Sequence, residues 1–170
     1  FDDMLVYVDD AGTPIATEAK PLVHHGDTKL HLAFSIFLFN SQGALLLQQR
    51  ALTKKTWPGV WSNSCCGHVM LHEKTIDAAK RRLKFELGIS GVELKLILPD
   101  FRYRAEKDGV VENEICPVFV GVTDKLPRPN RDEVEAVKWV DWCDFQSEAA
   151  SPDTDISPWA VEEIELLIAN

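Results

Sequence analysis

Residues capable of acid–base and metal chemistry occur at four separate places in the sequence. They are His24 with His31, the run from Asn63 to His68, Tyr103, and the triplet Glu112–Glu114. Three imidazoles and two carboxylates are suitable ligands for a metal ion. The thiols, the phenol and the remaining carboxylate oxygens would add proton donors and acceptors at the same place, which a purely structural metal site does not need. The combination indicates an enzyme.

The spacing within these stretches supports a shared site. Residues two apart on a strand point to the same face, so the two carboxylates of Glu112–Glu114 project together, and Cys66 aligns with His68 if that segment is extended. Taken singly, each pattern has a simpler explanation, because exposed strands often carry paired carboxylates and a buried cysteine usually packs as a small apolar residue. Their joint occurrence in a chain with five histidines favours one site. We expect His25 and His72 to be exposed.

Basic residues that could bind a diphosphate are scattered along the chain. They are Lys20, Arg50, Lys54, Lys55, Arg81 and Arg82. Each one alone is more often an exposed surface residue. Arginine and lysine are nevertheless the natural ligands of a diphosphate, usually with Mg²⁺ bridging its oxygens. Glu86 follows Arg81 and Arg82 on the predicted helix, where it could hold such an ion.

Composition indicates one compact domain over residues 1–170. The 170 residues include 45 % hydrophobic and 26 % charged ones, which is ordinary for a globular protein with one core. The net charge of -9 argues against nucleic acid or an anionic membrane as the main partner, because both attract basic surfaces. An anionic substrate must therefore meet a local cationic patch.

The sequence also favours a cytoplasmic protein. No apolar run approaches the roughly 18 residues of a membrane-spanning helix, and the first residues lack the pattern of a secretory signal. The four cysteines form no CxxC pair, and adjacent Cys65 and Cys66 have poor geometry for a disulfide framework. We expect reduced thiols.

Strand and turn signals predict a sheet rich in hairpins. Residues 32–39 and 45–49 are apolar runs separated by Asn40–Gly43, and residues 101–105 and 110–122 flank Asp108–Gly109, a favoured tight turn. Residues 92–98 and 136–140 are predicted as further strands, and no internal repeat or linker is present. The prediction is an α/β fold with a mixed sheet covered by helices, rather than a doubly wound parallel sheet.

Two helices are predicted from periodicity and end signals. Apolar residues recur at helical spacing from Ile76 to Leu87, and Gly88 supplies the stop. Near the carboxyl end, Ser157 offers an N-cap and Pro158 a first-turn proline to a helix that runs through Ile168.

The segment from Gly67 to Ile89 resembles a Nudix box, the strand–loop–helix motif that holds diphosphate-bound metal in that superfamily. The matching residues are Gly67, Glu73, Arg81, Leu83, Glu86, Gly88 and Ile89. The segment departs from the hydrolase pattern at Arg82 and Phe85, where acidic residues are expected. These departures argue against pyrophosphate hydrolysis.

A more extensive resemblance accounts for the departures. The motifs are LHLAFSIFLFN (residues 30–40), RALTKKTWPGVWSNSCCGH (50–68), RRLKFELG (81–88), PDFRYRA (99–105), VENEICPVF (111–119) and SPW (157–159). In this order they resemble the type I isopentenyl-diphosphate isomerases over nearly the whole chain, and collinear motifs are far more specific than a lone Nudix box.

The resemblance implies a role for each candidate residue. The implied ligands of one divalent metal, Mn²⁺, Zn²⁺ or Mg²⁺, are His24, His31, His68, Glu112 and Glu114. The implied catalytic residues are Cys66 rather than Cys65, Glu114, Tyr103 as its hydrogen-bonding partner, and Trp159 facing the developing cation. Glu86 and the Cys66 backbone would contact Mg²⁺ on the substrate diphosphate. The implied cationic contacts of that diphosphate are Lys20, Arg50, Lys54 and Arg82.

The implied reaction belongs to isoprenoid biosynthesis and converts isopentenyl diphosphate into dimethylallyl diphosphate through a tertiary carbocation. The expected partner is this small molecule alone, and we expect a monomer. Two alternatives are a Nudix hydrolase of nucleoside diphosphates, which should keep the acidic pair that Phe85 interrupts, and a metal-binding Nudix domain without catalysis, which would have no need of Cys66 opposite Glu114.

Overall fold

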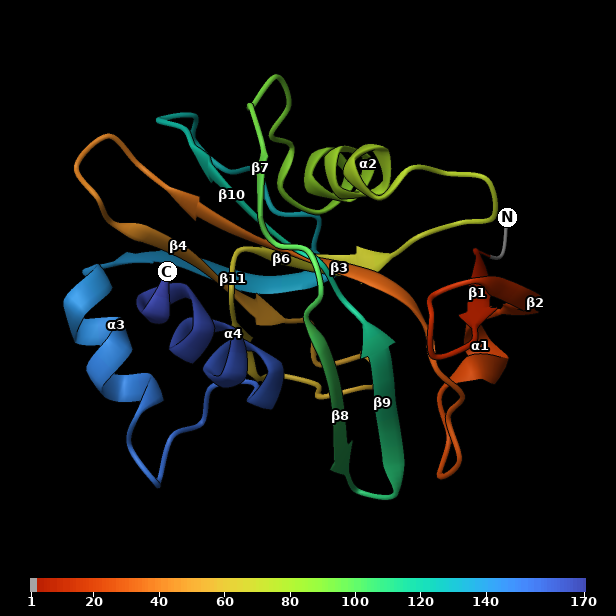
Figure 1. The fold of residues 1–170 in the computed structure, drawn as a ribbon. Helices are drawn as coiled ribbons and strands as arrows, with labels where there is room; N and C mark the ends of the chain where they lie inside the picture. Colours follow the sequence, from red (N-terminus) through yellow and green to blue (C-terminus); the bar gives the residue numbers. More distant parts are fainter. Residues whose placement is uncertain (1–2) are drawn as a thin grey trace.

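A computed structural model describes residues 3–170 as an 11-stranded sheet with four helices (Figure 1). The elements are β1 (Met4–Val8), β2 (Pro14–Ala19), α1 (Lys20–Val23), β3 (His31–Phe39), β4 (Leu45–Arg50), β5 (Trp61–Ser62), β6 (Cys65–His68), α2 (Thr75–Leu87), β7 (Lys95–Leu98), β8 (Arg102–Lys107), β9 (Val110–Ile115), β10 (Val118–Val122), β11 (Val134–Val140), α3 (Trp142–Ala149) and α4 (Pro158–Ala169). Parallel and antiparallel pairs coexist in the sheet, which confirms the predicted mixed α/β fold.

Strand β3 is the centre of the sheet. It pairs in parallel with β9 and β10 and antiparallel with β1, β4 and β6. Its sequence is almost continuously apolar, as expected for a strand that is covered on both faces. Most of its residues are buried, so β3 is a rigid base from which side chains can be presented.

Alternate residues of β3 point to opposite faces of the sheet. Phe34, Ile36 and Leu38 belong to an apolar cluster that includes residues of α2, whereas Ala33 and Phe37 belong to a second cluster that includes residues of α3 and α4. Figure 1 shows α2 on one side of the sheet and α3 with α4 on the other. The odd-numbered residues of β3 therefore face α4.

Both predicted helices are present. In α2, Ala79, Leu83 and Leu87 are buried, and Gly88 ends the helix in the left-handed region at φ 65°. Helix α4 begins at Pro158 as predicted, but the expected cap by the Ser157 side chain is wrong. Its hydroxyl instead lies 2.8 Å from the Ser62 hydroxyl, so this serine attaches the start of α4 to β5.

The pairing of the predicted hairpin strands differs from the expectation. Strands β3 and β4 are joined by the predicted turn, but they pair only between Phe39 and Leu45. Beyond this pair, β4 diverges to pair with β11, and β6 occupies the place beside β3. The strand predicted at 92–98 begins only at Lys95, and the strand predicted at 136–140 begins at Val134.

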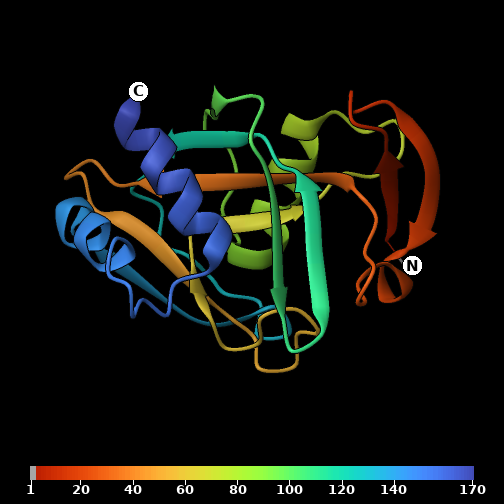
Figure 2. The same cartoon turned by 60° about the horizontal axis from the view of Figure 1, so that its bottom comes forward.

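The stretch predicted as one strand over 110–122 is divided by Cys116 and Pro117 into β9 and β10. Proline has no amide hydrogen for the ladder, and its carbonyl accepts from the Ser35 amide at 3.0 Å. Strand β9 pairs with β8 in the predicted hairpin, and the two lie side by side in Figures 1 and 2.

Five other elements were not predicted. These are the β1–β2 hairpin, the short α1, the two-residue β5, and α3 with its Asp141 side chain capping the Asp144 amide. Within residues 3–170, no helix has the length and apolarity needed to cross a bilayer.

Candidate active site

A cavity of about 380 Å³ brings the separated chemical residues together. Its wall includes His24, His68, Glu112, Glu114, Cys66, Tyr103, Trp159, Lys20, Arg50, Lys54 and Arg82. The other two predicted site residues, His31 and Glu86, are buried at 0 % and 2 % exposure and do not line the cavity. His25 and His72 are exposed, as expected.

Three imidazoles and one carboxylate form a compact cluster at one end of the cavity. Ligand atoms of His24, His31, His68 and Glu112 all lie within 4.8 Å of one another. The three rings have centroid separations of 5.1, 5.2 and 5.2 Å. Glu114 lies beside this cluster, with Oε2 3.4 Å from His68 Nε2 and 3.7 Å from His31 Nε2.

The donor set of this cluster fits a divalent cation. The Nε2 atoms of His24 and His31 and Glu112 Oε2 are buried without a hydrogen-bond partner in the described residues, although His24 Nε2 and Glu112 Oε2 are only 3.0 Å apart. Buried polar atoms are rarely left unpaired. Two ligands at right angles on a metal, each about 2.1 Å from it, would be separated by about 3 Å. The cluster is therefore compatible with a divalent metal.

Local contacts hold the imidazoles in a ligand form. His31 Nδ1 lies 2.8 Å from the Lys29 carbonyl, and donating its proton there leaves the Nε2 lone pair facing the cluster. Burial is the main cause that lowers the pKa of His31 to about 4. Burial, followed by the charge of His31, lowers the pKa of His68 well below its ordinary value. Neutral imidazoles are the form that binds metal.

The two carboxyl groups of β9 have different environments. Burial would raise the pKa of Glu112, but neighbouring His24 and His31 lower it overall. Burial, and then the charge of Glu112, raises the pKa of Glu114 well above its ordinary value. The Tyr103 hydroxyl donates to Glu114, across the β8–β9 pair that places these residues opposite each other. Neighbouring carboxyl groups with separated pKa values are a common basis for acid and base roles.

Strand β6 places its two cysteines on opposite sides. Cys66 and His68 face the cavity, as their spacing predicts for an extended segment, whereas Cys65 joins the apolar cluster against α2. The Cys66 thiol donates to Asn63 Oδ1 at 3.0 Å and lies 3.5 Å from Ser35 Oγ. Burial is the main cause that raises the pKa of Cys66 to about 12, so the thiol keeps its proton at neutral pH.

Cationic side chains also line the cavity. Arg82 pairs with Glu86 and Glu133, and Lys54 also pairs with Glu133. Burial, followed by the charges of Lys54 and Arg82, lowers the pKa of Lys20. Lys20 and Arg50 form no ion pair among residues 3–170, so their charges remain open to an anion. This is the cationic patch that the acidic composition requires.

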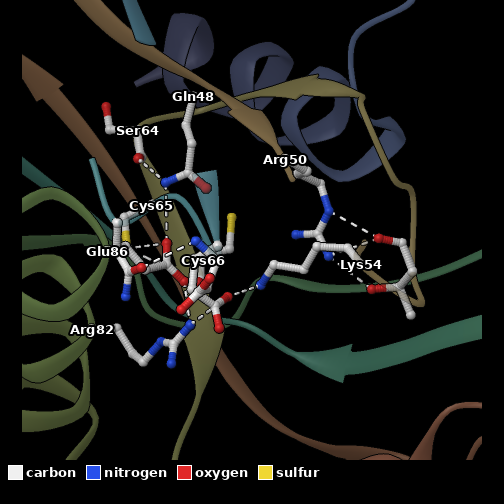
Figure 3. A network of polar contacts seen from close by, with 12 residues as sticks. Gln48, Arg50, Lys54, Ser64, Cys65, Cys66, Arg82 and Glu86 are labelled. Carbon is white, nitrogen blue, oxygen red and sulfur yellow. Dashed lines mark hydrogen bonds and ion pairs between the residues drawn. The ribbon is translucent and has the colours of Figure 1, made fainter. Parts of the chain in front are cut away.

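Glu86 is already satisfied by donors from three elements (Figure 3). One of its oxygens pairs with Arg82, and the other accepts from Gln48 Nε2 at 3.1 Å and from Cys65 Sγ at 3.3 Å. The sulfur atoms of Cys65 and Cys66 point apart in Figure 3. This donor set leaves no free oxygen on Glu86 for a cation, so its role as a Mg²⁺ ligand stays a prediction.

Aromatic rings close the cavity beside α4. Trp159 lies 5.7 Å from Tyr103 and 5.4 Å from Trp57, measured between ring centroids, and the Arg50 guanidinium lies 5.6 Å from its ring. Trp57 has a φ of 44°, which is unusual for a residue other than glycine, especially before Pro58. Backbone strain of this kind concentrates at functional sites. No role was expected for Trp57 from the sequence.

Sequence reasoning assigned no role to three further buried residues at this site. Asn63 and Ser35 contact Cys66, and Glu163 contacts Ser35 at 2.6 Å. Ser35 lies inside an apolar run, and Glu163 lies within the acidic pair Glu162–Glu163 of a helix, so neither attracts attention in the sequence. The one usable signal is that Glu163 follows Trp159 by four residues, which places both on one helix face.

The chain carries a NUDIX domain, which matches residues 29–160. Solved structures share this fold: DR0079 from Deinococcus radiodurans has a TM-score of 0.74, 17 % identity and 98 % coverage of both chains. The MutT protein from Methanosarcina mazei Go1 has a TM-score of 0.66 and 17 % identity, and covers 82 % of this chain and 94 % of its own. At these identities the likeness concerns the fold.

Sequence relatives define the family more narrowly. Three proteins named isopentenyl-diphosphate Delta-isomerase are 51 % identical (Saccharopolyspora erythraea), 48 % identical (Mycolicibacterium vanbaalenii) and 46 % identical (Escherichia coli). They align with 98, 98 and 92 % of this chain and with 86, 92 and 87 % of their own lengths. The chain belongs to the isopentenyl-diphosphate Delta-isomerase family of enzymes, which confirms the resemblance drawn from its motifs.

Proposed function

We propose that this enzyme converts isopentenyl diphosphate into dimethylallyl diphosphate within the cavity, with Cys66 and Glu114 as its two proton-transfer groups. The observation that carries this proposal is that a thiol and a Tyr103-bonded carboxyl group line the same cavity as several cationic side chains. A hydrocarbon with a diphosphate at one end matches such a cavity.

The proposed binding separates the two ends of the substrate. Lys20, Arg50, Lys54 and Arg82 contact the diphosphate, since charge-assisted hydrogen bonds to phosphate oxygens are strong. This leaves the hydrocarbon beside Tyr103, Cys66 and Trp159. Mg²⁺ bound to the diphosphate, with Glu86 and the Cys66 backbone as further contacts, is part of the proposal, although Glu86 must first give up a present donor.

The proposed reaction moves one double bond by two proton transfers. One group adds a proton to the terminal methylene, which leaves a tertiary cation on the adjacent carbon. The other group removes a proton from the carbon beside the oxygen-bearing one, and its electron pair forms the new double bond. One of the two groups must begin protonated and the other ionised. The raised pKa of Cys66 keeps its thiol protonated as the donor, and Glu114 in its carboxylate form accepts the second proton.

The walls of the cavity protect the cation. Water would capture a tertiary cation as an alcohol, so the reaction needs a dry pocket. The Trp159 indole, 3 % exposed, offers its electron-rich face, and a desolvated cation–π contact contributes about 2 kcal/mol. A divalent metal, Mn²⁺, Zn²⁺ or Mg²⁺, held by His24, His31, His68, Glu112 and Glu114, would withdraw electron density from the Glu114 carboxyl group and so favour its ionised form, which can accept a proton.

The cysteines and the origin of the cavity residues bear on the compartment and the oligomeric state of the enzyme. All four cysteines are free, which supports a reducing compartment such as the cytoplasm. The proposed catalytic and diphosphate-binding residues that line the cavity all come from one chain, so we propose a single-domain enzyme that acts as a monomer.

Turnover in D₂O tests the function and the chemistry together. The enzyme is incubated with isopentenyl diphosphate and Mg²⁺, and the products are examined by NMR. We expect dimethylallyl diphosphate with deuterium in its new methyl group, because the added proton comes from groups that exchange with solvent. Unlabelled product would contradict proton transfer by Cys66 and Glu114, and phosphate release from nucleoside diphosphates without any isomer would contradict the function itself.

A further inference from the structure

Glu163 is a fully buried acidic residue, with 0 % exposure, on the face of α4 that also carries Trp159. None of the ion pairs among residues 3–170 involves it. An unpaired carboxylate inside a protein is strongly unfavourable. Burial accordingly raises the pKa of Glu163 well above its ordinary value. Complete burial without an ion pair therefore favours the neutral carboxylic acid in the folded protein.

The neutral acid has one polar neighbour, Ser35. Glu163 Oε1 lies 2.6 Å from Ser35 Oγ, and Oε2 has no partner among the described residues. A carboxylate could only accept this bond, but a neutral acid can donate it. If Ser35 were the donor, the acid hydroxyl would stay buried and unpaired, whereas an unpaired carbonyl oxygen is better tolerated. The favoured arrangement is donation from Glu163 to Ser35.

This direction leaves the Ser35 hydroxyl hydrogen available for a thiol. Ser35 Oγ lies 3.5 Å from both Cys66 Sγ and Cys116 Sγ. The Cys66 hydrogen is already directed elsewhere, because the thiol donates to Asn63 Oδ1, and the Asn63 amide nitrogen is fixed by two backbone carbonyls at 2.9 and 3.2 Å. Ser35 therefore meets a lone pair of the Cys66 sulfur.

We propose that neutral Glu163 and Ser35 form a positioning pair that orients the Cys66 thiol for proton transfer to the substrate. Ser35 stands directly opposite Cys66 in the β3–β6 ladder, so the sheet sets their separation. By donating to Ser35, Glu163 directs the Ser35 hydroxyl hydrogen toward the Cys66 sulfur. A carboxylate at position 163 would accept that hydrogen instead, and Cys66 would lose the contact. This inference rests on the proposed role of Cys66. It implies that α4 positions both the Trp159 ring and, through Glu163 and Ser35, the Cys66 thiol.

Three substitutions test the pair. Glu163→Leu removes the polar contact at similar size, Ser35→Ala removes the hydroxyl, and Glu163→Gln keeps a neutral group that can donate to Ser35. We expect the first two to lower kcat about tenfold, the effect of one lost hydrogen bond. KM should stay within about twofold, because the proposed diphosphate contacts lie on other elements, and Glu163→Gln should stay within about threefold of the wild type in kcat. The exposed neighbour supplies the control, Glu162→Leu.

Wild-type kcat in a folded Glu163→Leu variant would overturn the proposal, and so would an equal loss in Glu163→Gln, since the acid itself would then be required. Thermal melting establishes that each variant folds, and Ser35→Ala decides the question if Glu163→Leu does not. Infrared difference spectra of wild type against Glu163→Gln at neutral pH, without substrate, should show the carbonyl band of a protonated acid. A carboxylate band instead would contradict the neutral Glu163 on which the pair depends. Activity in a Cys66→Ala variant would contradict only the proposed role of the thiol in the reaction.

Discussion

Adjacent identical side chains acquire different chemistry in this enzyme because of strand geometry. Cys66 points into the cavity and contacts Asn63 and Ser35, whereas Cys65 is 1 % exposed and packs against α2. Their order relative to His68 is enough to distinguish them once β6 is extended, because residues two apart share a face. The sequence therefore predicted which cysteine lines the site.

Substitution of each cysteine should separate catalysis from packing. We expect Cys66→Ala to lower kcat more than about a thousandfold, the scale for losing a proton-transfer group together with its geometry. Cys65→Ala should keep most of the activity and lower the free energy of unfolding by roughly 1 kcal/mol, because it loses its bond to Glu86. Steady-state kinetics and urea unfolding measure both effects, and equal kinetic losses would contradict the assignment.

A neutral Glu163 also predicts how stability depends on pH. The folded chain keeps this proton above pH 4.5, the ordinary pKa of the group, while the unfolded chain releases it. The contribution of Glu163 to stability is therefore fully present below about pH 4.5. It falls as the pH rises toward the folded pKa, by at most about 1.4 kcal/mol per pH unit.

Urea unfolding of the wild type and Glu163→Gln at pH 5 and pH 8 checks this effect. Glutamine cannot titrate, so the unfolding free energy of Glu163→Gln minus that of the wild type should be larger at pH 8 than at pH 5. The groups that face Glu163 are the same in both proteins, namely Ser35, Cys66, Cys116 and Glu162. An equal difference at both pH values would mean that Glu163 is ionised in the folded protein.

At the scale of the element, residue ranges were easier to predict than partners. The apolar run 32–39 and the period from Ile76 to Leu87 determine β3 and α2, because burial acts on local pattern. The pairing of β4 with β11 depends on contacts across more than 80 residues, and no local signal encodes it. Ser35 and Glu163 were missed for the same reason, since only the meeting of β3 with α4 reveals their burial.

The packing of β6 against α2 gives a prediction at Gly67. A Cβ atom there would lie 2.9 Å from Phe34 Cζ and 3.0 Å from Arg82 Cγ. Gly67→Ala must therefore move the Phe34 or Arg82 side chain, or shift β6 itself, which carries Cys66. We expect a loss of about 1 to 3 kcal/mol in unfolding free energy from overpacking, with a lower kcat and a higher KM.

Gly26→Ala is the matched control for this change. Its Cβ would make only an ordinary contact, 3.5 Å from the Gly109 carbonyl oxygen, and neither Gly26 nor Gly67 has a positive φ. Thermal melting and steady-state kinetics compare the two variants. If Gly67→Ala melts and turns over like Gly26→Ala, the close approach of β6 to α2 has no functional importance.

At the scale of the whole molecule, the cluster of three imidazoles and one carboxylate connects parts of the chain that are remote in sequence. His24 follows α1, His31 begins β3, His68 ends β6, and Glu112 lies in β9. Within residues 3–170, the ladder between β1 and β3 consists of one pair, Tyr7 with His31. A bound ion would add a link among the amino-terminal segment, the sheet and the β8–β9 hairpin, so metal content should control stability as well as chemistry.

Removal and return of metal test this link. By its ligand count the cluster should hold about one ion per chain in elemental analysis. Mn²⁺ or Zn²⁺ returned to chelator-treated protein should raise the melting temperature, because an ion that binds only the folded state stabilises it by about 2.7 kcal/mol at a concentration of 100 Kd. Hydrogen exchange should slow in β9 and around His24, far more than in α3, which contacts none of the ligands.

Two neighbouring histidines provide the control. His24→Ala removes a cluster ligand, whereas His25→Ala changes an exposed ring beside it. Each variant is compared with and without metal, so any loss of intrinsic stability cancels. The metal-dependent rise in melting temperature should shrink in His24→Ala and persist in His25→Ala. An equal rise in both, with unchanged exchange in β9, would show that the ion binds elsewhere, and the imidazoles would then need another explanation for their unpaired nitrogen atoms.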